Sequence, residues 1–170
     1  MSEGQLTDRV LDGLETDFNI RRQVYGSHFS GKRLRIDAIV TPKDGAGWKD
    51  CNPALGIEFK DTLRLKDDTR NFTHWLGQCV DYASTEWDEF GYLYVFTCPG
   101  LGGGLRKYEA QGDGTQLLPR IMSCLGIGEL RRSRFYGPTF YLHQSHRVWS
   151  KRRGVEEGRR WSLTRKFGSR

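Results

Sequence analysis

Residues 91–97 (GYLYVFT) are apolar at both odd and even positions. Successive side chains of a strand point to opposite faces, so a strand of this composition needs apolar cover on both of them. A sheet with a layer packed on each side provides that cover. The segment therefore predicts an interior strand of a layered domain.

Two other segments alternate between apolar and polar residues, as strands with two different faces do. Residues 33–40 (RLRIDAIV) follow residues 24–29 and a Ser-Gly-Lys turn, which predicts a β-hairpin. Residues 54–60 (ALGIEFK) place three apolar side chains on one face and Glu58 with Lys60 on the other. Both segments are expected to join the sheet.

Helical spacing of apolar residues predicts helices at about residues 7–22 and 71–87. A short helix is expected at 116–126 around Pro119, and a last strand at 139–143. This order of helices and strands predicts an α/β domain with a mixed sheet flanked by helices.

The charge of the chain is unevenly distributed. Residues 144–170 hold nine Lys and Arg against two Glu, a net charge of +7, whereas residues 1–143 carry −1. We therefore expect one folded domain over 1–143 and a basic C-terminal segment over 144–170. An excess of positive charge favours a polyanionic partner.

The four cysteines form no Cys-x-x-Cys pair, which argues against zinc ribbons and dense disulfides. Three of them lie in or beside apolar stretches, where a reduced cysteine acts as a small hydrophobic residue. The chain has no run of 18 apolar residues and no basic-then-apolar leader pattern at its start. These features predict a cytoplasmic protein without a membrane partner.

Three residues on the two alternating strands carry the candidate chemistry. Asp37 stands among apolar residues, where a carboxylate needs a cation or a hydrogen-bond donor. If its strand pairs with residues 54–60, Asp37 comes close to Glu58 and Lys60. Two carboxylates suit Mg²⁺, which binds hard oxygen ligands, water and phosphate. A lysine there suits the positioning or activation of a water molecule.

These residues resemble the signature of the PD-(D/E)XK nuclease superfamily. Asp37 is followed after twenty residues by Glu58-Phe59-Lys60, which matches D…(D/E)xK. Residues 78–82 (QCVDY) match the QxxxY motif of its RecB-like and lambda-exonuclease-like branch. The resemblance covers roughly residues 10–97 and implies a restriction-endonuclease-like α/β core.

The resemblance also implies a function, namely cleavage of DNA phosphodiester bonds with Mg²⁺ or Mn²⁺. The metal ligands it implies are Asp37, Glu58 and the Phe59 carbonyl. Glu15 stands where many members carry an additional acidic residue, which either binds a second metal or only shapes the pocket.

Three further residues receive catalytic roles from the same resemblance. Lys60 would act on the attacking water. Gln78 and Tyr82 would order the active site and the nearby backbone.

Basic residues in the C-terminal segment are candidates for DNA binding, because cations release counterions from phosphates. They are Arg147, Lys151, Arg152, Arg153, Arg159 and Arg160. Trp149 lies among them and could stack on bases. The alternative is a disordered, solubilising tail. Residues 131–136 (RRSRFY) also mix cations with aromatics, as nucleic-acid surfaces and solvated turns both do.

Other interpretations stay open. Glu58 and Lys60 could form a weak surface ion pair, and Asp37 could pair with Arg33 or Arg35. Within the nuclease class, a structure-selective junction resolvase is an alternative, and a homodimer with two active sites would favour it. A catalytically inactive DNA-binding or virion protein is another. The small size suggests a stand-alone phage or mobile-element enzyme.

Overall fold

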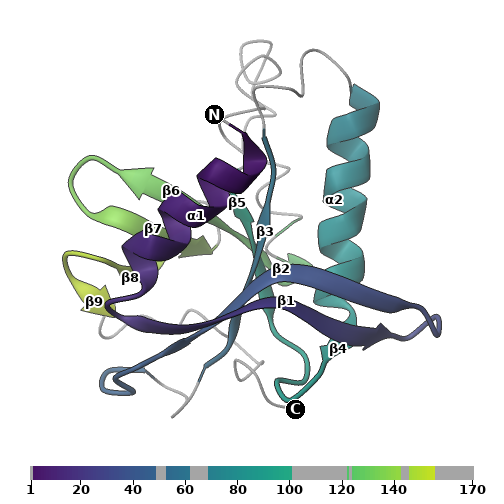
Figure 1. Ribbon diagram of the computed structural model, residues 1–170, viewed down its shortest axis with the longest axis horizontal. Coiled ribbons are helices and arrows are strands. Elements are labelled where there is room, and N and C mark those ends of the chain that lie inside the picture. The colour runs from purple at the N-terminus through teal and green to yellow at the C-terminus, as the bar shows by residue number, and fades with distance from the viewer. Residues whose placement is uncertain are drawn as a thin grey trace.

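A computed structural model describes residues 2–48, 53–61, 69–100, 122, 124–142 and 146–155. These ranges contain two helices, α1 (Glu3–Leu14) and α2 (Thr69–Ala83), and a single nine-stranded sheet (Figure 1). The strands are β1 (Phe18–His28), β2 (Arg33–Pro42), β3 (Leu55–Phe59), β4 (Thr85–Trp87), β5 (Tyr94–Cys98), β6 (Ile127–Ser133), β7 (Gly137–Leu142), β8 (His146–Ser150) and β9 (Gly154–Val155).

The strand order across the sheet is β4-β1-β2-β3-β5-β6-β7-β8-β9. The pairs β3–β5 and β5–β6 are parallel, and the other six pairs are antiparallel. Because β3, β5 and β6 run the same way, their C-terminal ends lie at one edge of the sheet.

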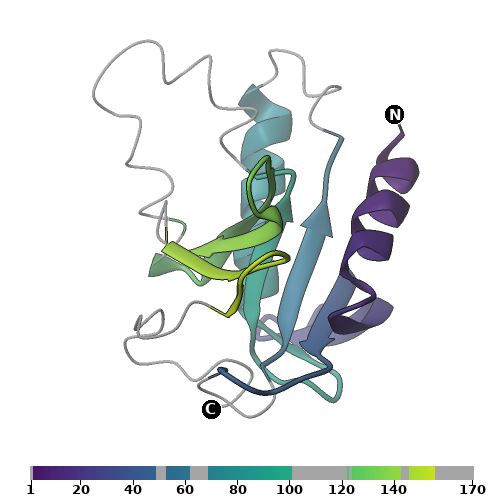
Figure 2. The ribbon, with the colours of Figure 1, turned by 90° about the vertical axis from the view of Figure 1, so that its left-hand side faces the viewer.

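The two helices lie on opposite sides of the sheet (Figure 2). Helix α1 buries Leu11 and Leu14 in a core that includes Phe96 and Phe140. Helix α2 contributes to a second core, which holds these residues of the helix: Trp75, Cys79, Tyr82 and Ala83. Apolar side chains on both faces of the central strands explain why residues 91–97 are apolar at both parities.

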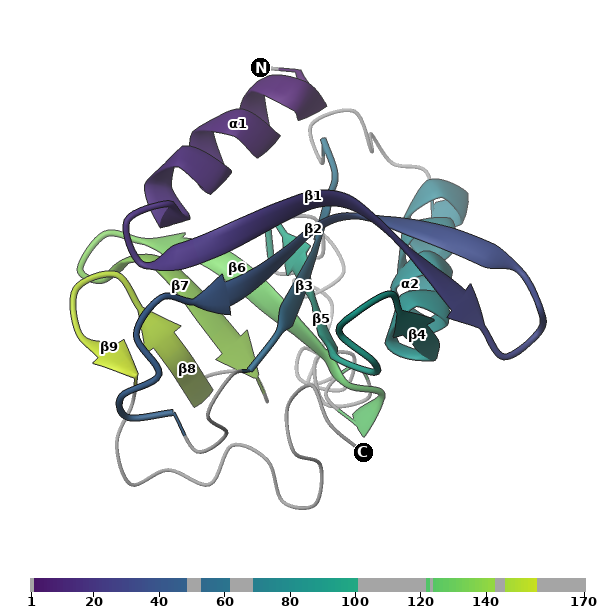
Figure 3. The ribbon, with the colours of Figure 1, turned by 60° about the horizontal axis from the view of Figure 1, so that its bottom comes forward.

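Strands β1 and β2 are the longest and curve from the side of α1 to the side of α2 (Figure 3). Strand β4 pairs with the far end of β1, where Gly26 lies opposite Trp87. A Cβ atom at Gly26 would come within 2.6 Å of Thr85 and 2.7 Å of the Trp87 ring. Only glycine allows this close approach, which holds β4 against β1.

The expected restriction-endonuclease-like α/β core, a mixed sheet flanked by helices, is wrong. The described residues are mostly β, with one sheet curled like half a barrel and only two helices. One reason is that α1 ends at Leu14 and β1 begins at Phe18, inside the helix expected over 7–22. Phe18 fits the helical spacing, but it packs as a strand residue against Phe140 and Trp149.

The C-terminal half adds three strands that were not expected, β6, β8 and β9, whereas β7 coincides with the strand expected at 139–143. Strands β6 to β9 extend the sheet, and β8 and β9 lie within the basic segment 144–170. Trp149 on β8 is buried in the core, so it does not stack on bases. The helix expected at 116–126 lies largely outside the described residues, as do residues 156–170. In the described part of the chain, no helix is long and apolar enough to cross a membrane.

Candidate active site

The candidate site lies where β2 and β3 stop pairing. The antiparallel ladder runs from Val40–Leu55 to Ala38–Ile57 and ends there. The next pair in the same register is Asp37 and Glu58, so the two carboxylates face each other across the end of the ladder. Beyond the ladder, the Asp37 side chain still links β2 to β3, because the Phe59 N–H donates to its Oδ2 at 2.9 Å.

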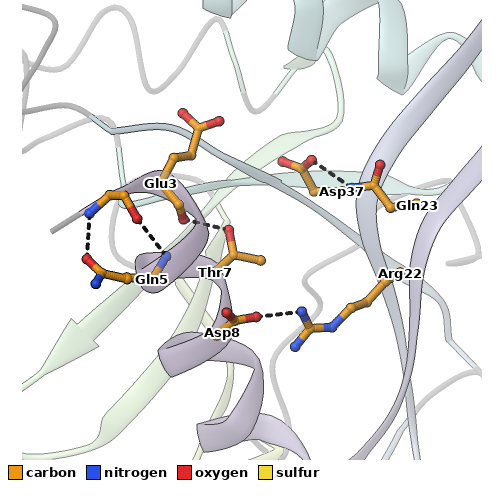
Figure 4. A network of polar contacts seen from close by, with 8 residues as sticks. Glu3, Gln5, Thr7, Asp8, Arg22, Gln23 and Asp37 are labelled. Atoms are coloured by element: carbon orange, nitrogen blue, oxygen red, sulfur yellow. Dashed lines mark hydrogen bonds and ion pairs between the residues drawn. The ribbon is translucent and has the colours of Figure 1, made fainter.

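Asp37 has a second neighbour on its other side. Gln23 lies opposite it on β1, between the pairs Arg22–Ala38 and Val24–Ile36. Its Nε2 donates to Asp37 Oδ1 at 3.4 Å (Figure 4). Gln23 adopts a left-handed backbone with φ of 54°, which is unusual for a residue with a side chain. Strain of this kind tends to persist at functional sites.

Glu58 is buried, with only 5% of its surface exposed. Its Oε1 accepts a hydrogen bond from Gln78 Nε2 at 2.8 Å, whereas the ionised Oε2 has no donor among the described residues and can bond to Asp37 only when a proton lies between them. Burial raises the pKa of Glu58 from 4.5 to about 9, and the nearby Asp37 carboxylate adds to this. The positive charge of Lys60 lowers the pKa of Glu58, but by less than burial and Asp37 raise it. A carboxylate in this position needs a cation or a proton.

Gln78 and Tyr82 lie one turn apart on α2 and connect the helix to both strands. Gln78 Nε2 also donates to the Tyr82 hydroxyl oxygen at 2.7 Å. The Tyr82 hydroxyl in turn donates to the Arg35 carbonyl at 2.7 Å. Burial raises the pKa of Tyr82 to about 12, so its hydroxyl keeps the proton that it donates. The QxxxY pattern thus fixes the orientation of Glu58 relative to β2.

Lys60 follows directly after β3 and is partly buried. Its N–H donates to the Cys98 carbonyl at 2.9 Å, so its backbone is attached to the end of β5. The positive charge of its side chain lowers the pKa of Glu58, against the larger effects of burial and Asp37. Asp37, Glu58, Lys60, Gln78 and Tyr82 are therefore all brought together.

Glu15 is not brought to this group. It is the C-cap of α1, where its carbonyl accepts a hydrogen bond from Lys43 Nζ at 2.6 Å. Glu3 occupies the opposite end of the 12-residue helix, about 18 Å away along the axis. The Glu3 carboxylate accepts the Asp61 N–H at 3.1 Å and raises the pKa of Glu58 (Figure 4 shows it projecting from the first turn).

Sequence reasoning missed Glu3 because it started the helix at residue 7. The signal was present in Ser2 and Gln5, which form a capping box at the start of α1. Their spacing, Ser-x-x-Gln, is a recognised mark of a helix N-terminus. Gln23 was also missed, and its position opposite Asp37 follows only from the strand register.

The oxygen atoms of Asp37 and Glu58 could supply some, but not all, of the ligands of a hard divalent cation. Among the described residues, no group of three or more His, Cys, Asp and Glu side chains is placed to hold a metal. However, Mg²⁺ commonly takes only one or two carboxylates and completes its shell with water and substrate phosphate. The unpartnered Oε2 of Glu58 beside Asp37 is the feature that such a cation would satisfy.

Four of the basic residues predicted to bind DNA lie on β8 or in the β8–β9 turn, beside or near the turn between β6 and β7. Arg147 and Arg153 place their guanidinium carbons 4.1 and 5.0 Å from the centre of the Tyr136 ring. Arg152 donates to the Phe135 carbonyl at 3.4 Å, and Lys151 is paired with Asp17. Arg159 and Arg160 lie outside the described residues.

No protein-family model, curated protein or solved structure matches the chain. The function has to be inferred from the geometry of the site.

Proposed function

We propose that the chain is a metal-dependent nuclease that hydrolyses phosphodiester bonds in DNA. One observation carries the proposal: Asp37 and Glu58 face each other at the end of a strand ladder, and Glu58 is buried with an unpartnered oxygen. An ordinary structural pair would combine a carboxylate with a cation or a donor. Two carboxylates held this close are typical of a site that receives a cation.

The residues that would hold Mg²⁺ or Mn²⁺ are Asp37, Glu58 and the carbonyl of Phe59. When bound, the ion would supply positive charge against the phosphate oxygens as the bond to phosphorus forms. Asp37 is already fixed by the Phe59 N–H, and Glu58 by Gln78. Both carboxylates are therefore oriented before any ligand arrives.

Lys60 is the residue proposed to act on the water. It follows Glu58 by two positions, and its backbone is fixed by β5. Its amine would donate hydrogen bonds that orient the attacking water and the substrate phosphate. Gln78 and Tyr82 act through Glu58, as positioning residues.

The test is incubation of the purified chain with linear, closed-circular and four-way-junction DNA, in Mg²⁺, Mn²⁺ or EDTA. We expect cleavage that needs a metal and is lost in Lys60→Ala. The matched control is Lys32→Ala, which removes an exposed lysine from the β1–β2 turn. Cleavage in EDTA, or full activity of Lys60→Ala, would contradict the proposed mechanism.

Two other outcomes would point to the alternatives. Symmetric nicks confined to the junction would indicate a resolvase. Salt-sensitive DNA binding without cleavage in any metal would refute the enzyme and leave a DNA-binding or virion protein.

A further inference from the structure

The turn between β6 and β7 presents an aromatic side chain on a fixed backbone. Ser133 Oγ accepts the N–H groups of Phe135 at 3.2 Å and Tyr136 at 3.3 Å. Gly137 closes the turn with φ of 70°, and Arg152 donates to the Phe135 carbonyl. The Phe135 side chain is nevertheless 73% exposed. The Phe135 ring is thus exposed to solvent on a turn whose backbone is held by several hydrogen bonds.

The tip is surrounded by positive charge. Residues 131–142 contain three arginines and no acidic residue; Arg131 is paired with Glu129, and Arg132 and Arg134 are exposed. Tyr136 beside the tip carries two guanidinium groups near its ring, from Arg147 and Arg153. Stacking on one ring keeps these two cations in place. Charge complementarity therefore favours a polyanionic partner, and the exposed ring favours one that has bases to stack.

The hairpin also lies at the edge of the sheet that carries the acidic site. Glu58, Thr97 and Glu129 are in register across β3, β5 and β6. Strand β6 continues four residues past Glu129, about 13 Å, and β3 and β6 are two strand spacings apart, about 10 Å. In Figure 2 the end of β3 and the β6–β7 tip both lie in the upper half, and Figure 1 shows that they lie on opposite sides of α1. One nucleic-acid strand is long enough to contact both places.

We infer that the β6–β7 hairpin binds single-stranded or frayed nucleic acid, with its arginines on the phosphates and Phe135 stacked on an unpaired base. The inference rests on the proposed function and deepens it, because it names the unpaired strand as the substrate class. Nucleic acid is favoured over an acidic protein because it offers both phosphates for the arginines and bases on which an exposed aromatic ring can stack.

The test is fluorescence anisotropy with a labelled single-stranded oligonucleotide, in EDTA so that no cleavage occurs. Phe135→Ala should weaken binding roughly 5- to 150-fold, because one stacking contact is lost. Its salt dependence should not change, since no charge is removed. The matched control is Phe29→Ala, which removes a ring that is 81% exposed at the tip of the β1–β2 hairpin. The control should bind like the wild type.

Arg134→Gln supplies a second readout. It should reduce the slope of log affinity against log salt by about 0.7, the value for one phosphate contact on a single strand. If only Arg134→Gln weakens binding and heparin competes equally with every variant, the hairpin binds polyanions by charge alone and the stacking inference is refuted. If Phe135→Ala binds like the wild type, or an acidic peptide binds more tightly than the oligonucleotide, the inference also fails.

The two proposals can fail separately. Metal-dependent cleavage with no effect of Phe135→Ala on binding would refute the hairpin inference alone. An effect of Phe135→Ala without cleavage in any metal would refute the nuclease alone. Absence of nucleic-acid binding by the wild type would refute the hairpin inference directly.

Discussion

Replacing Glu58 by Gln is expected to stabilise the metal-free protein at pH 7.5. The Glu58 carboxylate is buried beside Asp37 with one unpartnered oxygen, and its pKa is raised to about 9. Glutamine has the same shape as a protonated glutamate. Its amide oxygen can still accept from Gln78, while its NH₂ group can donate to Asp37. The substitution therefore removes the need to take up a proton on folding and keeps the hydrogen bonds.

The magnitude follows from the difference between the two pKa values of Glu58. Between pH 4.5 and about 9, the folded protein holds a proton that the unfolded chain has released. The contribution of Glu58 to stability is therefore complete below pH 4.5 and is lost as the pH rises toward 9. At pH 7.5 the loss is on the order of 4 kcal/mol, since each pH unit within this window costs about 1.4 kcal/mol. Glutamine should recover up to this amount.

The assay is urea unfolding between pH 5 and pH 9 in EDTA. The wild type should lose stability toward pH 9, and Glu58→Gln should lose less of it. The matched control is Glu129→Gln, because Glu129 is also buried in the sheet but lies 3.2 Å from Arg131 Nε. Glu129→Gln removes the negative charge opposite Arg131, so it should lower the free energy of unfolding by about 1–3 kcal/mol. Added Mg²⁺ should stabilise the wild type and not Glu58→Gln.

The reasoning would be refuted if Glu58→Gln destabilised the metal-free protein at pH 7.5 and kept the wild-type slope against pH. That result would mean that Glu58 is charged and satisfied in the folded state. The site would then have no need of a cation.

Three further substitutions test the structure around the site. Tyr82→Phe removes a hydrogen bond to the β2 backbone, so it should cost about 1 kcal/mol in urea unfolding and should lower kcat more than it raises KM. Gln23→Gly should be about 1 kcal/mol more stable than Gln23→Ala, because both remove the amide but only glycine relieves the left-handed backbone; equal stabilities would show that position 23 is unstrained. Gly56→Ala should lose about 1–3 kcal/mol, since its Cβ would lie 2.6 Å from Leu93 and 2.8 Å from Ile36; wild-type stability would show that these side chains move aside.

The central part of the fold and most of the site could be predicted from local patterns. Strict alternation marked residues 33–40 and 54–60, where the structure has β2 and β3. Helical spacing marked most of α2, although the helix expected over 71–87 includes residues that form β4. The approximate positions of Asp37 and Glu58 followed from the alternating strands, whereas the place of Gln78 in the site came from its resemblance to the QxxxY motif.

The rest depends on contacts between distant segments. Strand β6 (IGELRRS) has charged residues at both parities, and Glu129 is buried there with Arg131 as its partner. Such a segment becomes a strand only because β5 and β7 pair with it. The curl of the sheet likewise depends on how all nine strands pair with one another, which no local pattern indicates. These long-range pairings are why the expected helix-flanked core was wrong.

Several energetically costly features lie around one pair of carboxylates. A left-handed Gln23 lies opposite Asp37, Asp37 faces Glu58, and Glu58 is buried with an unpartnered oxygen. The capping box places Glu3 close enough to raise the pKa of Glu58 further. Replacing Glu58 by glutamine or an apolar residue would remove most of this cost. A chain that keeps a costly arrangement in an otherwise well-packed sheet is expected to gain something from it, and the proposed cation would offset the charge of this carboxylate pair.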